Sequence, residues 1–140
     1  MNQDNTVHLD IPAHYQHLSI VSAVIAETLQ GFEQLEDHAQ VVYAVQLAVQ
    51  EVCVNIAKHG YNNAPGKRIR ISIELVKDPL QVIIQLLDQG EWFDISQVPE
   101  PDMDNPQVHG YGLFLIRQIM DDINYTQQAD GNIWRLVKNL

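Results

Sequence analysis

Apolar residues follow two different periods along the 140-residue chain, and the change of period separates helices from strands. In residues 14–31 and 37–59 they recur every three to four positions, which is typical of helices packed on a core. Residues 6–11 and 68–76 instead alternate apolar and polar side chains. Alternation of this kind predicts strands with one buried face. Residues 80–88, after the turn at Asp78 and Pro79, are a predicted strand that ends at Asp88.

The C-terminal third repeats this change of period. Residues 111–120 have a helical pattern, and 123–128 and 132–138 are predicted strands around a turn at Asp130 and Gly131. The whole order is strand, helix, helix, two strands, loop, helix, two strands. We therefore predict one α+β domain over residues 1–140, a two-layer sandwich whose mostly antiparallel sheet carries its helices on one face.

The longest helical pattern, residues 37–59, also predicts its own ends. Asp37 is placed to cap the first turn. Gly60 is expected to end the helix in the left-handed conformation that glycine adopts easily. The expected core stripe of this helix consists of Val41, Val45, Ala48, Val52 and Ile56.

The net charge of the chain makes some classes of binding partner unfavourable. A formal net charge of −10 disfavours unspecific binding to nucleic acid or to an anionic membrane, because like charges repel. The one basic cluster, Lys67, Arg68 and Arg70, is expected to be the solvated face of a strand.

Cysteine content and the apolar stretches bear on location. Cys53 is the single cysteine, which excludes an internal disulfide, and we expect it to be a small core residue. The N-terminus lacks a signal-peptide pattern, and the apolar stretch 19–29 is too short to span a bilayer. A cytoplasmic protein is therefore predicted.

Three short segments carry candidate chemistry. The first holds Glu51 and Asn55, whose spacing of four residues places both on one helix face. A carboxylate can orient or deprotonate a hydroxyl, and an amide oxygen can ligate Mg²⁺. Taken alone, such a pair is usually the wet side of a helix.

The other two segments contain glycines. Asp88 stands at the end of an apolar strand, and Gly90 follows two residues later. The carboxylate could accept a hydrogen bond from an exocyclic amine, such as that of adenine. The glycine would let the backbone approach a flat ring closely. Gly110 and Gly112 precede a helix, whose free N–H groups can bind an anion. Taken alone, each of these is more often an ordinary turn.

Together, the segments EVCVNIAKHGY, LLDQGEWFD and GYGLFLIRQIMDDINY, in this order, resemble the GHKL-type (histidine-kinase-like) ATPase family. Within it, the chain is most similar to the small anti-sigma-factor serine/threonine kinases of bacteria. The resemblance runs from about residue 7 to the C-terminus. It implies ATP and Mg²⁺ as cofactors and the same two-layer fold.

The resemblance also implies roles for single residues. Glu51 would be the catalytic base and Asn55 the Mg²⁺ ligand. Asp88, with Gly90 beside it, would hold the adenine amine. The phosphates would lie against Gly110 and Gly112, under a lid formed by residues of about 92 to 109.

The function implied is phosphorylation of a serine or threonine on a STAS-type anti-sigma-factor antagonist. A sigma factor is a further implied partner, and a homodimer is suggested. The acidic lid motivates an alternative, a non-catalytic protein that holds a sigma factor or another regulator in a nucleotide-sensitive complex. Simple ATP hydrolysis stays open as a third hypothesis.

Overall fold

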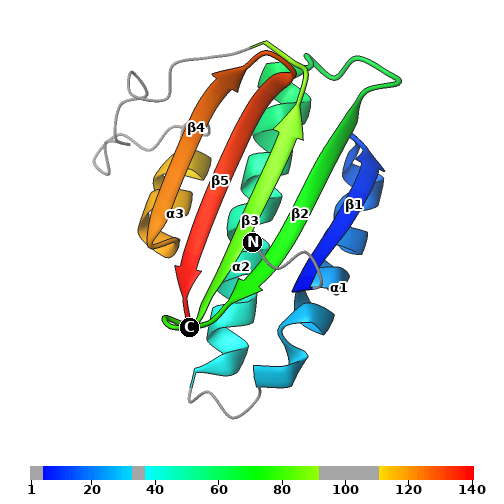
Figure 1. The fold of residues 1–140 in the computed structure, drawn as a ribbon. Helices are drawn as coiled ribbons and strands as arrows, with labels where there is room; N and C mark the ends of the chain where they lie inside the picture. Colours follow the sequence, from blue (N-terminus) through cyan, green and yellow to red (C-terminus); the bar gives the residue numbers. More distant parts are fainter. Residues whose placement is uncertain (1–4, 33–36, 92–110) are drawn as a thin grey trace, which may run out of the picture.

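The computed structural model describes residues 5–32, 37–91 and 111–140. Its five-stranded sheet has the order β1-β2-β3-β5-β4, and every neighbouring pair is antiparallel (Figure 1). Each strand lies where the sequence predicts one. The strands are β1 (Thr6–Pro12), β2 (Arg68–Val76), β3 (Gln81–Asp88), β4 (Asp122–Gln128) and β5 (Gly131–Asn139).

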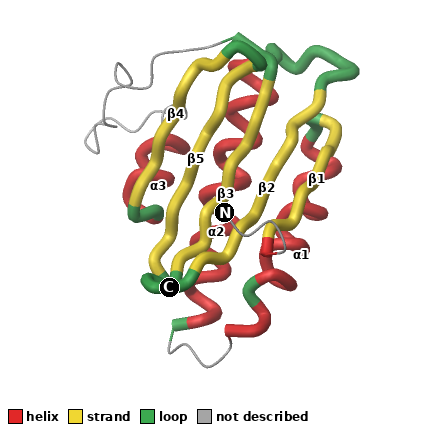
Figure 2. Tube along the Cα trace, viewed as in Figure 1, coloured by secondary structure: helices red, strands yellow, loops and turns green. Residues whose placement is uncertain are grey.

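Three helices lie on one face of this sheet: α1 (Leu18–Thr28), α2 (His38–Asn55) and α3 (Tyr111–Ile119). Figure 2 shows the helices as one layer behind the sheet, with α2 between α1 and α3. The predicted α+β sandwich with helices on one face is thus confirmed.

The end of α2 differs from the prediction. The helix continues as a π-helical turn, Ile56–Gly60, and the left-handed residues come later, at Asn62 (φ 52°) and Asn63 (φ 57°). The predicted left-handed Gly60 is therefore wrong. Asp37 does occupy the N-cap position of α2, but its side chain makes no capping hydrogen bond. Single π-turns within helices often occur at functional sites.

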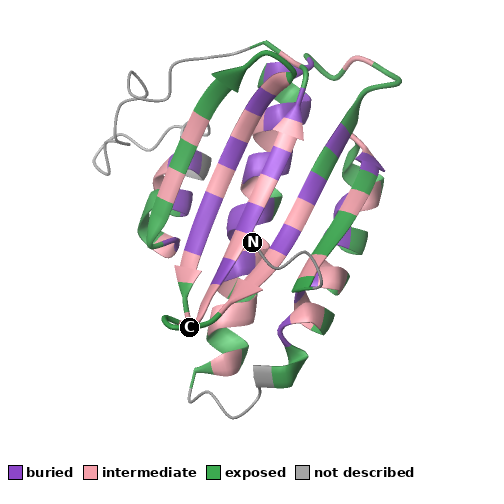
Figure 3. Ribbon diagram, in the orientation of Figure 1, coloured by how far each residue is buried: buried purple, intermediate pink, exposed green. Residues whose placement is uncertain are grey.

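The core lies between the sheet and the helices. Along β3 buried and half-buried residues alternate strictly. Figure 3 shows similar banding on β5, interrupted where Leu136 and Val137 are both buried. Burial on the helix side confirms Cys53 as a core residue, since it is 1% exposed. The same burial raises the pKa of its thiol to about 12, so the thiolate needed for nucleophilic chemistry is scarce at neutral pH.

The helical segment His38–Gly60 is long and apolar enough, by length and composition alone, to cross a membrane. In the structure it packs against the sheet between two other helices. Val45, Val49 and Val52 on this segment are buried members of the core. Core packing therefore accounts for its apolar face.

Candidate functional site

Asp88 ends β3, the middle strand of the sheet, and its side chain is only 2% exposed. Its Oδ1 accepts hydrogen bonds from the Gly90 N–H (2.8 Å) and from Asn132 Nδ2 (3.1 Å). Its Oδ2 accepts none from the residues that the structure describes. Burial raises the pKa of Asp88, and the hydrogen bonds from Asn132 and Gly90 oppose that rise.

Main chain from three glycines packs around Asp88: Gly60 and Gly90 lie beside its carboxylate, and Gly131 lies against its backbone carbonyl. A Cβ on Gly90 would lie 2.5 Å from the carbonyl carbon and oxygen of Gly60. A Cβ on Gly131, whose φ is +140°, would collide with the Asp88 carbonyl oxygen. The Glu91 N–H also donates to the Gly60 carbonyl at 2.8 Å. The end of the α2 segment, the end of β3 and the start of β5 therefore meet backbone to backbone.

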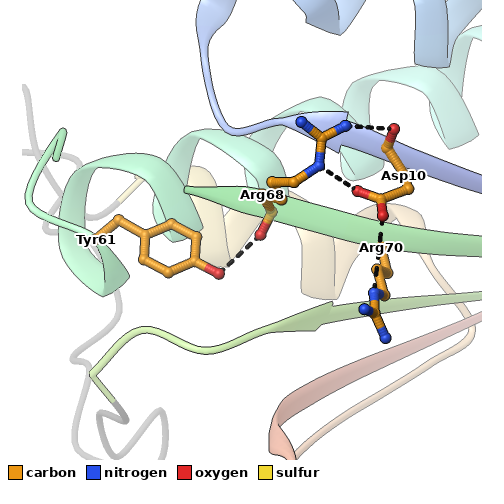
Figure 4. Close-up of polar contacts among 4 residues, drawn as sticks. All are labelled: Asp10, Tyr61, Arg68 and Arg70. Carbon is orange, nitrogen blue, oxygen red and sulfur yellow. Dashed lines mark hydrogen bonds and ion pairs between the residues drawn. The ribbon is translucent and has the colours of Figure 1, made fainter. Parts of the chain in front are cut away.

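Tyr61 fixes the loop that carries this contact. Its hydroxyl accepts a hydrogen bond from the Gln89 N–H (2.8 Å) and donates one to the Arg68 carbonyl (2.7 Å; Figure 4). Tyr61 itself is buried, and burial raises its pKa. It thus joins the end of the α2 segment to β2 and to the residue after Asp88, which is a structural role.

Arg68 and Arg70 lie on the outer face of β2, as predicted, whereas Lys67 precedes the strand and its Nζ lies 5.9 Å from the centroid of the Tyr61 ring. Arg68 Nε donates to Asp10 Oδ1 at 2.7 Å, and Arg70 Nε lies 3.9 Å from Asp10 Oδ2 (Figure 4). The Arg68 and Arg70 side chains remain 54% and 72% exposed. Exposed ion pairs of this kind stabilise a fold by about 0–1 kcal/mol.

Glu51 and Asn55 are both half-buried on α2. On the α1 side of this helix, Gln46 Nε2 donates to the Ser22 carbonyl of α1 at 2.8 Å. Asn55 follows Gln46 by nine residues, which at about 100° per residue is half a turn around the helix axis. Asn55 therefore lies on the flank of α2 that faces α3, and Glu51 lies one turn before it.

The helix α3 approaches this flank with its N-terminal end. The carbonyl of its C-terminal residue, Ile119, accepts a hydrogen bond from Lys138 Nζ (2.7 Å). Lys138 pairs with the start of β3, so this contact lies at the far end of the strand from Asp88. The helix consequently runs antiparallel to α2, with Gly112 in its first turn (Figure 1). Gly110 and the predicted lid, residues 92–109, lie outside the described residues.

Cation ligands are sparse in the described part of the chain. No group of three or more His, Cys, Asp or Glu side chains there is placed to hold a metal ion. A Mg²⁺ ion at Asn55 would need oxygen ligands from elsewhere, and substrate phosphates commonly supply them.

One hollow, of about 340 Å³, has Asp88, Tyr61 and Arg68 in its lining, and a larger one, of about 520 Å³, is lined by Pro12, Asn63 and Lys67 among others. A further hollow does not reach Asp88. It measures about 410 Å³ and lies on the outer face of the sheet, between Asp10, Arg70, Leu87 and Ile133. The Asp88 carboxylate faces the helix layer instead. We therefore place the candidate site by its hydrogen bonds and close contacts rather than by this hollow.

A family model described as a histidine kinase-like ATPase domain matches residues 11–138. This chain belongs to the histidine kinase-like ATPase family. The predicted family is thus confirmed.

Proteins named serine-protein kinase RsbW are similar over most of this ATPase chain. The one from Bacillus cereus (strain AH187) is 30% identical, over 88% of this chain and 78% of that protein. The one from Oceanobacillus iheyensis is 24% identical, over 91% of this chain and 83% of that protein. Their names agree with the predicted kinase activity.

Solved structures support the fold of this ATPase chain. The RsbU and RsbW domains of Rv1364c from Mycobacterium tuberculosis superpose with a TM-score of 0.67 at 19% identity, covering 96% of this chain. The match covers 32% of that chain, so this ATPase chain spans about a third of its length. A histidine kinase domain from Erythrobacter litoralis EL346 gives a TM-score of 0.55 at 15% identity, covering 93% of this chain and 62% of that one.

Sequence reasoning placed Asp88 and Gly90 of this ATPase chain correctly beside each other but missed three of their neighbours. These are Asn132, Gly60 as a contact of Gly90, and Gly131 as a contact of Asp88. A correct prediction that β3 pairs with β5 could have found Asn132, because this pairing places Asn132 directly opposite Asp88. The ligand-binding and catalytic roles of all the predicted site residues stay predictions: Glu51, Asn55, Asp88, Gly90, Gly110 and Gly112.

Proposed function

We propose that this chain binds ATP at Asp88 and, with Mg²⁺, phosphorylates a serine or threonine of a STAS-type anti-sigma-factor antagonist. The observation that carries the proposal is the Asp88 carboxylate. It is buried among glycine backbones, and its Oδ2 accepts no hydrogen bond from the described residues. Oδ2 is thus available to a ligand, and the exocyclic amine of adenine is a suitable donor.

The glycines support the purine as well. Gly60 and Gly90 leave no side chain between the end of the α2 segment and the end of β3. In the proposal, the purine lies beside this packed main chain and not between the two glycines, whose backbones are in contact. In the proposal, the phosphates extend from the purine toward Gly110 and the first turn of α3 at Gly112, where free N–H groups favour negative charge.

Glu51 and Asn55 supply the chemistry in this proposal. Asn55 ligates Mg²⁺ through its amide oxygen, and the ion neutralises charge on the phosphates. The partner hydroxyl oxygen forms a bond to the γ-phosphorus while the bond from that phosphorus to the β,γ-bridging oxygen breaks. ADP leaves, and Glu51 takes the hydroxyl proton.

Two measurements test the proposal in sequence. Calorimetry with ADP and Mg²⁺ is expected to show binding to the wild type and a loss of about tenfold or more in Asp88→Asn, because a charged acceptor is lost. Incubation with Mg-ATP and a STAS-type protein encoded nearby is then followed by intact mass. Transfer of one phosphoryl group supports the kinase; ATP binding with no transfer would contradict it.

A second candidate function rests on the acidic composition. Residues 92–110 contain Glu100, Asp102 and Asp104 but no lysine or arginine, and the chain carries a net charge of −10. Acids near phosphates oppose transfer unless a cation compensates them. The chain would then be a non-catalytic protein that holds a sigma factor or another regulator. That function predicts a complex whose affinity depends on ADP or ATP, without phosphate transfer.

A further inference from the structure

We infer that Asn132 makes the site selective for adenine over guanine by occupying one oxygen of the Asp88 carboxylate. The inference rests on the proposed nucleotide binding and goes beyond it, because it assigns the base preference to a residue on a different strand.

The position of Asn132 is tightly defined. It stands opposite Asp88 in the β3–β5 pairing and is 2% exposed. Its Nδ2 donates to Asp88 Oδ1 (3.1 Å) and to the Gly90 carbonyl (2.9 Å). The reversed amide would turn its own oxygen toward two acceptors, so these partners fix the orientation of the amide.

This arrangement leaves the carboxylate with a single usable oxygen. Asp88 Oδ1 already accepts two hydrogen bonds, from the Gly90 N–H and from Asn132, which fills its two lone pairs. Only Oδ2 remains for a ligand. Both N–H groups of the Asn132 amide are also used, so Asn132 has no donor left for a ligand oxygen.

The two purines differ in what they present to one oxygen. Adenine offers an exocyclic amine, a donor that a single acceptor satisfies. Guanine offers at the same position an oxygen, which the carboxylate repels. Turned the other way, guanine offers its N1–H and 2-amine side by side, and that pair needs both carboxylate oxygens. Buried polar groups left unpaired give strong discrimination, so both guanine poses are disfavoured.

The test compares ADP, GDP and IDP by calorimetry on wild type and Asn132→Ala. IDP has the guanine edge without the 2-amine. In the wild type we expect ADP to bind about tenfold or more tighter than GDP, and GDP and IDP to agree within about twofold. In Asn132→Ala the freed Oδ1 can accept the 2-amine, so GDP should gain about tenfold over IDP. Asn124→Ala, an exposed asparagine on β4, is the matched control and should keep the wild-type ratios.

The outcomes separate the inference from the proposed function. A wild type that binds none of the three nucleotides overturns the nucleotide site itself. If ADP binds but Asn132→Ala weakens all three nucleotides in equal proportion, Asn132 is only structural and the inference fails. A wild type that prefers GDP over IDP tenfold also overturns it. Should Asn132→Ala not fold, as judged by circular dichroism, Asn132→Ser is measured in its place.

Discussion

The two ends of the candidate site are built differently. At the purine end, Asp88, Gly90 and Asn132 are joined by hydrogen bonds, and a Cβ on Gly90 would overlap Gly60. On the α2 flank, Glu51 and Asn55 are half-buried and make no side-chain hydrogen bond with the rest of the described chain. Under the proposed function, this difference means that the groups for base recognition are already held in place before a ligand arrives. The groups proposed for chemistry, by contrast, keep their bonding capacity for metal and substrate.

The largest expected effect separates these two ends directly. Glu51→Gln keeps the size of the side chain but removes the proposed base. We expect phosphoryl transfer to fall by roughly 10²–10⁴-fold, because general-base catalysis contributes about that much. ADP affinity should stay within about twofold. Transfer is read by intact mass and binding by calorimetry.

Gln50→Ala, a change at the exposed neighbouring residue, is the control and should leave both quantities unchanged. A Glu51→Gln variant that loses ADP binding as severely as transfer would show that the two ends do not work separately.

The next effect concerns the crowded purine end. Gly90→Ala places a methyl group 2.5 Å from the Gly60 carbonyl, so backbone must shift. Overpacking of this kind costs about 1–3 kcal/mol in the free energy of unfolding. Urea denaturation measures that cost, and ADP titration should show weakened binding. Gly31→Ala is the matched control, because no atom lies within 4 Å of its added Cβ. Equal stability of the two variants would refute the close packing.

A smaller effect is expected at the support of the purine end. Tyr61→Phe removes the hydroxyl that bonds the Gln89 N–H and the Arg68 carbonyl. Two partly buried hydrogen bonds are then lost, each worth about 0.5–1.5 kcal/mol. Thermal unfolding should show this loss, whereas Tyr43→Phe, at a tyrosine that is 65% exposed, should be close to neutral. An unchanged melting temperature in Tyr61→Phe would contradict the supporting role.

The smallest effect is a pH dependence. Burial raises the pKa of Asp88 in the folded chain above its unfolded value. The folded state then holds the proton of the Asp88 carboxyl group more tightly than the unfolded state does. The resulting contribution to the free energy of unfolding is fully present below the unfolded pKa of about 3.9 and is lost as the pH rises through the raised pKa. The Asp88→Asn variant does not lose this stability with rising pH, because asparagine does not titrate. Its free energy of unfolding, relative to wild type, should therefore increase between pH 4 and pH 7 in urea titrations.

Asp130→Asn, in the β4–β5 turn, controls for removal of an exposed carboxylate. A difference between Asp88→Asn and wild type that stays constant over this range would mean that burial does not perturb the carboxyl.

Sequence reasoning succeeded where the signal is local. Alternation along 68–76 predicted β2, the apolar stretch 80–88 after a turn predicted β3, and helical spacing along 37–59 predicted α2. Each of these signals lies within a few neighbouring residues. Together these elements predicted the layer arrangement that the structure has. Asp88 and Gly90, two residues apart at a strand end, were likewise recognisable as a pair.

Prediction failed where the determining contact is distant in sequence. Gly60 was expected to be glycine for its own backbone conformation, but the structure shows Gly90 pressed against it. Asn132 bonds Asp88 across 44 residues, and no local pattern announces such a contact. Gly131 was recognised as a turn residue, whereas its second constraint, the approach to the Asp88 carbonyl, depends on strand register.

The glycine-lined surroundings of Asp88 have a consequence for inhibition. Around this carboxylate, Gly90 and Gly131 cannot acquire a side chain without collision. A compound that contacts the backbone there would meet a surface that point mutations can hardly reshape. Resistance would have to arise farther out, at positions where substitution leaves the protein able to fold.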